Sequence, residues 1–186
     1  MAEPALQPRP MTLEEAALLD PDQYPGEVVE GEWVPVSRNT WRHGMIAGNA
    51  YALLRHYARQ HGGWSVAVGD PGTRLARNPD TLRGPDVAIV REERQPTGKG
   101  VEGWLDGAPD VAVEIVGDGQ TASELARKAL EYLAAGAKWV WVLDPGPRLL
   151  MLFTPPSGVR ILGPDDMLDG GDVLPGFACR VAEFFE

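Results

Sequence analysis

An acidic residue inside an apolar strand constrains this chain more than any other feature of its sequence. Residues 110–116 read Asp-Val-Ala-Val-Glu-Ile-Val, and a run this apolar predicts a β-strand that is buried on at least one face. Burying the Glu114 carboxylate without a partner would cost several kcal/mol, so Glu114 needs a metal, a cation or a polar cavity. The alternative is that Asp110, Ala112 and Glu114, which share one face of the strand, face solvent.

Length and composition fit one globular domain. The chain has 186 residues, of which 44% are hydrophobic and 24% charged. Cys179 is the single cysteine, which fits a reducing compartment, and we expect a cytoplasmic protein. No apolar run approaches the roughly 20 residues that cross a bilayer, and residues 1–10 lack the apolar stretch of a signal peptide, so no membrane partner is expected.

Charge is unevenly distributed along the chain. The net charge of −10 argues against a general nucleic-acid coat protein, which would be basic. Residues 38–94, however, hold nine Arg against five acidic residues and all three His. This segment either marks a side that faces phosphates or reflects ordinary variation of the surface.

Helix and strand patterns predict a mixed sheet flanked by helices, an α/β or α+β domain. Capping boxes begin the helices predicted at 11–19 and 121–135, and a longer helix is predicted at 41–60. Residues 27–36 predict a hairpin that turns at Glu30-Gly31, while residues 92–106 read as a polar loop and 181–185 as a short closing helix. Further strands are predicted at 64–68, 73–76, 86–91, 110–116, 138–143, 149–153 and 159–162.

Asp86 and Lys128 are the candidate partners of Glu114. Asp86 follows Gly84-Pro85 and opens a predicted strand, although an Asp after Pro is by itself more often a turn residue. Lys128 lies on the helix that follows the Glu114 strand. The alternative for Lys128 is a surface ion pair with a neighbouring glutamate on the same helix.

Two further candidates lie nearer the N-terminus. Glu27 opens the hairpin and is either a third acidic ligand or a surface residue, and spacing does not choose between it and Glu30 or Glu32. His43, with Arg42, lies near the start of the long helix and is either a polar surface group or part of the site.

Several enzyme classes lack their motifs in this sequence. There is no GxxxxGK[ST] loop, no GxGxxG pattern, no His pair at zinc spacing and no GxSxG serine, and Gly117-Asp118-Gly119 reads only as a tight turn. Kinase, zinc and serine-hydrolase functions are therefore poorly supported.

Together, the ordered motifs resemble the PD-(D/E)XK nuclease superfamily, and most closely its bacterial Uma-type family of restriction-endonuclease-like proteins. The resemblance covers roughly residues 27–145. Its elements are the acidic hairpin from Glu27, His43, Pro85-Asp86, Pro109-Asp110 with the strand that ends in Glu114-Ile115-Val116, Lys128 with Tyr132, Gly136, and the Trp-rich strand that ends in Asp144-Pro145.

This resemblance implies one restriction-endonuclease-like domain over residues 1–186, with its core at about 24–162 and an N-terminal hairpin. It implies a Mg²⁺-dependent endonuclease that hydrolyses phosphodiester bonds in DNA, with Mn²⁺ as an alternative metal. Asp86, Glu114 and the carbonyl of Ile115 would bind the metal, and Lys128 would orient water or stabilise negative charge. Glu27 would complete the acidic cluster directly or through water, and His43 and Arg42 would contact the flanking phosphate.

The sequence departs from the family pattern at two places. Val116 stands where a lysine usually follows the second acid by two residues, so the catalytic lysine would be Lys128 on the helix. Gly117-Asp118-Gly119 replaces the usual Ser-Pro-Ser turn. A catalytically inactive binding protein with the same fold is the alternative function, while an active enzyme that cuts two strands would be expected to form a homodimer or higher homo-oligomer.

Overall fold

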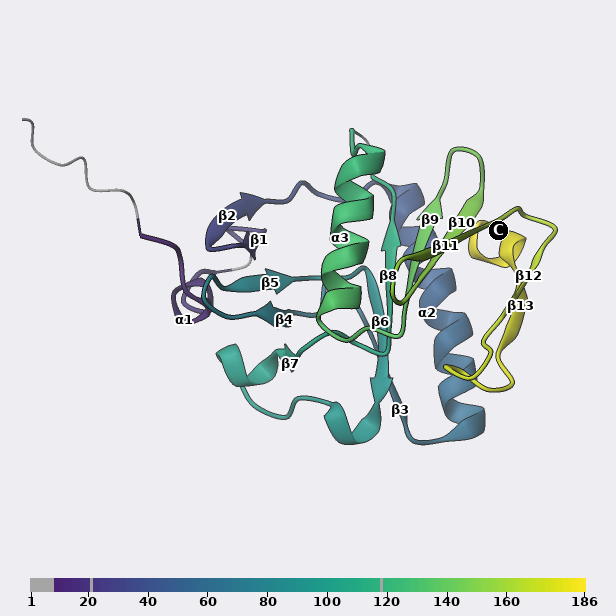
Figure 1. Ribbon diagram of the computed structural model, residues 1–186, viewed down its shortest axis with the longest axis horizontal. Helices are drawn as coiled ribbons and strands as arrows, with labels where there is room; N and C mark the ends of the chain where they lie inside the picture. The colour runs from purple at the N-terminus through teal and green to yellow at the C-terminus, as the bar shows by residue number, and fades with distance from the viewer. Residues whose placement is uncertain (1–8, 21, 118) are drawn as a thin grey trace, which may run out of the picture.

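The computed structural model describes residues 9–20, 22–117 and 119–186, and two β-sheets dominate it (Figure 1). Strands β8 and β9 of the larger sheet run parallel and are joined by helix α3 (Ala122–Ala134). All other pairs of neighbouring strands in this sheet are antiparallel. This is the mixed sheet that the sequence predicts. Within the described residues its six strands, in spatial order, are β11 (Gly158–Leu162), β10 (Leu149–Thr154), β9 (Trp139–Asp144), β8 (Val111–Ile115), β6 (Val87–Arg91) and β3 (Trp64–Val68).

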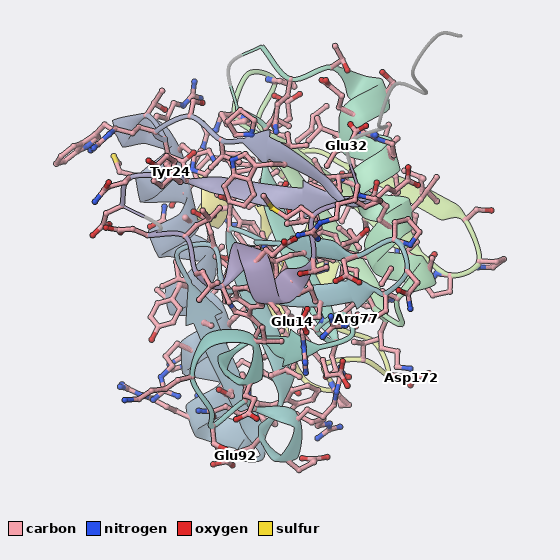
Figure 2. The ribbon with its side chains drawn as sticks, turned by 90° about the vertical axis from the view of Figure 1, so that its left-hand side faces the viewer. Glu14, Tyr24, Glu32, Arg77, Glu92 and Asp172 are labelled. Carbon is pink, nitrogen blue, oxygen red and sulfur yellow. The ribbon has the colours of Figure 1, made fainter. Side chains whose placement is uncertain are left out.

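The smaller sheet contains the predicted N-terminal hairpin. Its turn falls at Glu30 and Gly31, whose φ angles of 51° and 79° suit a tight hairpin connection. A short helix, α1 (Leu13–Ala16), packs on this sheet, and Figure 2 shows Glu14 of that helix beside Arg77, which it binds at 3.0 Å. The strands in spatial order are β2 (Glu32–Pro35), β1 (Gly26–Val29), β5 (Thr81–Arg83), β4 (Thr73–Ala76) and β7 (Leu105–Asp106).

Helices α2 (Trp41–His61) and α3 cover opposite faces of the larger sheet (Figure 1). Successive residues of a strand point to opposite faces, so Val113 and Ile115 of β8 pack in the core with α2. Ala112 packs in the second core with α3. Glu114 therefore points toward α3.

Helix α3 begins at the predicted capping box. The Glu124 N–H donates to Thr121 Oγ1 at 3.3 Å, and the Thr121 N–H donates to Glu124 Oε2 at 2.8 Å. Gly136 has a φ of 104° just beyond the helix, as expected of a residue that ends it. The predicted turn at 117–119 includes Asp118, which lies outside the described residues.

Several sequence predictions need correction. Residues 92–106 are more than a polar loop, because Leu105 is buried and its N–H donates to the Gly72 carbonyl, which adds β7 to the sheet. The helix predicted at 11–19 is only α1, and Leu18 beyond it is largely exposed. Strand β5 and the pair β12 (Met167–Asp169) and β13 (Ala178–Arg180) were not predicted, because strands of three residues are too short for a periodic pattern.

The remaining elements are 3₁₀ helices. The closing helix predicted at 181–185 is of this type, and its Val181 and Phe184 join the core under α2. None of the helices in the described part of the chain is long and apolar enough to cross a membrane. The 3₁₀ helices are η1 (Glu92–Arg94), η2 (Gly100–Gly103) and η3 (Val181–Phe184).

Candidate active site

An open cleft of about 1520 Å³ gathers the residues that the sequence singles out. Its walls come from the smaller sheet, the beginning of α2, the end of β8 and the first turns of α3. The predicted site residues that line it are Glu27, Arg42, His43, Asp86, Glu114, Ile115 and Lys128.

Lys128 bridges two carboxylates inside this cleft. Its Nζ lies 2.9 Å from Glu114 Oε2 and 3.1 Å from Glu27 Oε1. Burial alone would lower the pKa of Lys128, but the Glu114 and Glu27 carboxylates raise it above its ordinary value. Interpreting Lys128 as a surface residue paired along its own helix is therefore wrong.

Glu114 is buried, with 4% of its surface exposed, so a solvated strand face is also excluded. The Tyr132 hydroxyl donates to its Oε1 at 2.8 Å from one turn further along α3. Burial raises the pKa of Glu114 to about 7, and the nearby Asp86 and Glu27 carboxylates add to this against the effect of Lys128. Burial therefore disfavours the charged form of Glu114 more than the Lys128 ammonium favours it.

Asp86 is fixed to the strand that carries Glu114. It immediately precedes Val87, which pairs with Val113 across the β6–β8 ladder. Its Oδ2 accepts a hydrogen bond from the Ile115 N–H at 2.7 Å, and 8% of its surface is exposed. Asp86 is therefore bonded to the neighbouring strand, which places it next to Glu114 at the end of the ladder.

His43 and Arg42 reach the cleft in different ways. His43 is buried, so its interpretation as a surface group is wrong, and its Nε2 lies 3.3 Å from Asp86 Oδ1. Burial lowers the pKa of His43, but the hydrogen bond and charge of Asp86 outweigh this, and the net shift is upward. Arg42 is exposed, and its guanidinium donates to the Pro145 carbonyl at the rim.

Glu27 is held by three donors. The Gly84 N–H donates to its Oε1 at 2.9 Å, where Lys128 also binds, and Arg83 Nη1 donates to its Oε2 at 2.7 Å. Burial would raise the pKa of Glu27, but the charges of Lys128 and Arg83 and these hydrogen bonds lower it below its ordinary value. Glu30 and Glu32, which competed with Glu27 in the sequence, are exposed and do not line the cleft.

Sequence reasoning missed three residues of this site. Arg83 bridges Glu27 and Glu131, and Asp70 lies close enough to Asp86 for that charge, together with burial, to raise the pKa of Asp70. No sequence pattern marks either one. Tyr132 could have been assigned a role, because its spacing of four from Lys128 places both side chains on one helix face.

The basic segment at 38–94 does not form one phosphate-facing side. Arg74 pairs with Asp106, Arg94 pairs with Asp110, and Arg91 lies over the Trp64 ring. Only part of the segment, including Arg38, Arg42 and Arg83, lines the cleft.

The donors present fit a hard cation. Among the described residues, no three side chains of His, Cys, Asp or Glu are arranged to hold a metal ion. The predicted ligand set has only two such side chains, Asp86 and Glu114, and its third ligand is the backbone carbonyl of Ile115. All three offer oxygen, the ligand atom that Mg²⁺ takes while it keeps several waters. Burial is the main cause of the raised pKa of Glu114, and a cation bound beside this carboxylate would favour its charged form.

Comparison with known proteins assigns the chain to a nuclease-like class. A crystal structure of a "putative nuclease belonging to DUF820" from Anabaena variabilis ATCC 29413 has a similar fold, with a TM-score of 0.81 over 95% of this chain and 98% of that one at 17% sequence identity. Residues 13–182 match the Uma2 family, described as "Putative restriction endonuclease", and the chain belongs to this family. No curated protein is significantly similar to it in sequence. The predicted restriction-endonuclease-like fold is thereby confirmed.

Proposed function

We propose that this protein is a Mg²⁺-dependent endonuclease that hydrolyses phosphodiester bonds in DNA. The observation that carries the proposal is the convergence of an amine and two acids from separate elements. Lys128 Nζ lies 2.9 Å from Glu114, and Asp86 is bonded to the residue after Glu114. Membership of the Uma2 family supports the same reaction class.

Asp86, Glu114 and the Ile115 carbonyl would hold the metal, which is Mg²⁺ or alternatively Mn²⁺. When bound, the ion would polarise the scissile phosphate and lower the pKa of a bound water. Asp86 is preorganised for this role because the Ile115 N–H fixes one of its oxygens.

Lys128 would act as a cation in this reaction. Its pKa lies above the ordinary lysine value, so the amine stays protonated at neutral pH. A charged ammonium stabilises developing negative charge or orients a water, and it does not accept a proton. Arg42 at the rim and His43 behind Asp86 would contact the phosphates that flank the scissile bond.

Two measurements test the proposal. Calorimetric titration of Mg²⁺ and Mn²⁺ should give binding that Glu114→Ala abolishes, with Asp106→Ala, an exposed carboxylate outside the cleft, as the matched control. Plasmid nicking should require the metal and be lost in Asp86→Ala, and RNA of the same sequence should be cleaved more slowly. Equal metal binding by wild type and Glu114→Ala would overturn the metal site, and binding without nicking would select the inactive binding protein.

Assembly and location stay predictions. Cutting both strands of a duplex commonly uses two sites, so we propose a homodimer, which light scattering coupled to gel filtration would detect. We likewise propose a cytoplasmic location, which fractionation of the source cells would test.

A further inference from the structure

The Glu27 carboxylate holds three partners, one more than Asp86 or Glu114. Oε1 accepts from Lys128 Nζ at 3.1 Å and from the Gly84 N–H at 2.9 Å, and Oε2 accepts from Arg83 Nη1 at 2.7 Å. Charge-assisted hydrogen bonds of this kind are the strong ones in proteins. A metal bound by Glu27 would have to share an oxygen that already accepts from Lys128 or Arg83, in a site where 9% of the Glu27 surface is exposed.

Arg83 connects Glu27 to the helix that carries Lys128. Arg83 is buried, with 5% of its surface exposed. Its Nε and Nη2 donate to Glu131 Oε2 at 2.8 and 2.5 Å, and its Nη1 donates to Glu27. Glu131 follows Lys128 by three residues, so the two lie nearly one turn apart on α3. A planar guanidinium presents its donors in fixed directions, which makes this bridge rigid.

These contacts close a loop between the smaller sheet and helix α3. Lys128 binds Glu27, Glu27 binds Arg83, and Arg83 binds Glu131 on the same helix as Lys128. Without this loop, the long side chain of Lys128 would have only Glu114 to hold it.

We propose that Arg83 and Glu27 form a clamp that positions the Lys128 ammonium beside Glu114, and that Glu27 is a positioning residue and not a metal ligand. The geometric part of this inference stands on the contacts alone. Its consequence for catalysis rests on the proposed nuclease function.

The clamp can be tested without an activity measurement, by following the Lys128 ammonium directly. The chain has only three lysines, Lys99, Lys128 and Lys138. Lys99 and Lys138 are exposed, so in protein labelled with ¹⁵N-lysine we expect only Lys128 to give an ammonium signal protected from exchange with water. Glu27→Gln and Arg83→Gln should each speed that exchange by roughly tenfold or more, as loss of a hydrogen bond to a charged group would. Arg74→Gln is the matched control, since Arg74 lies on the adjacent strand and, among the described residues, forms an ion pair only with Asp106.

Metal binding and kinetics distinguish a clamp from a ligand. In both clamp variants the Mg²⁺ affinity should stay within about threefold of wild type, while kcat for nicking falls by roughly 10–100-fold with little change in KM, the usual size of such supporting effects. A tenfold loss of Mg²⁺ affinity in Glu27→Gln with an unchanged Lys128 signal would make Glu27 a ligand and reject the clamp. An unchanged signal and kcat in folded Arg83→Gln would also reject it.

A milder variant covers the case in which Arg83→Gln does not fold. Glu131→Gln removes only the negative charge of the outer partner of Arg83, at a side chain that is partly exposed. It should shift the Lys128 exchange rate and kcat in the same direction as the other two variants. If neither quantity moves, the clamp is wrong. Failure of the nuclease proposal looks different: wild type would not nick DNA, yet the Lys128 signal would still respond to the clamp variants.

Discussion

Lys128 and Tyr132, one turn apart on α3, bind different oxygens of the same carboxylate. Lys128 Nζ lies 2.9 Å from Glu114 Oε2, and the Tyr132 hydroxyl donates to Oε1 at 2.8 Å. One helix face therefore sets the orientation of the buried Glu114 side chain.

Tyr132→Phe tests this orientation. The side chain of Tyr132 is fully buried, so the variant leaves Glu114 Oε1 without its donor. We expect the free energy of unfolding to fall by about 1–3 kcal/mol, the usual cost of an unsatisfied buried polar group. Urea denaturation measures it, with Tyr51→Phe on α2 as the control. Equal loss in both variants would mean that the hydroxyl contributes nothing specific.

Stability should depend on pH through Glu114. The pKa of this group is raised from 4.5 to about 7 in the folded protein, so its favourable contribution is full below about pH 4.5 and is lost as the pH rises through 7. Glu114→Gln stays neutral throughout. Relative to wild type, its free energy of unfolding should therefore increase between pH 5 and pH 8, by on the order of 3 kcal/mol at most.

Denaturation at the two pH values, in the presence of a chelator, measures this difference. Glu32 is an exposed glutamate on the hairpin, so the free energy of unfolding of Glu32→Gln should differ from that of wild type by the same amount at both pH values. A Glu114→Gln offset that does not change with pH would contradict the raised pKa.

Lys128→Met should destabilise the metal-free protein. It removes the cation between Glu27 and Glu114, and breaking a buried ion pair costs about 3–5 kcal/mol. The loss should be smaller at pH 5, where Glu114 is protonated. Lys138→Met, at an exposed position, should stay within about 0.5 kcal/mol of wild type. Thermal and urea unfolding that showed similar effects for both lysines would place Lys128 at the surface.

Asp86→Asn should lower the pKa of His43. In the wild type, the hydrogen bond and charge of Asp86 outweigh the burial that would lower this pKa, and the asparagine removes the charge. Titration of the three histidines by NMR should show one imidazole whose pKa falls in Asp86→Asn and is unaffected in Asp106→Asn. A His43 pKa that does not respond would mean that Asp86 is not its main partner.

The sequence predicted those parts of the site that depend on patterns of a few neighbouring residues. The apolar strand around Glu114, the capping box at Thr121 and the hairpin turn at Gly31 are each encoded within a few neighbouring residues, and all three formed as expected. Patterns of this length also place Lys128 on its helix.

Long-range pairing is what sequence reasoning could not supply. Arg83 sits in a strand of three residues, and its partners Glu27 and Glu131 are 56 and 48 residues away, so nothing near Arg83 indicates that it is buried. The same limit explains why the sequence could not decide between the two interpretations of the basic segment, because some of its arginines pair with acidic residues that lie far away in the sequence. Arg74, for example, pairs with Asp106, which lies 32 residues further along the chain.

The clamp spans a boundary between two layers of the molecule. Glu114 belongs to the larger sheet, whereas Glu27 and Arg83 belong to the smaller one, which contacts α3 from the other side. Local opening of the N-terminal hairpin would therefore release the lysine while the six-stranded sheet stays folded. A protease cut within residues 30–36 would then detach Glu27 from Lys128 and leave the contact between Lys128 and Glu114 in place.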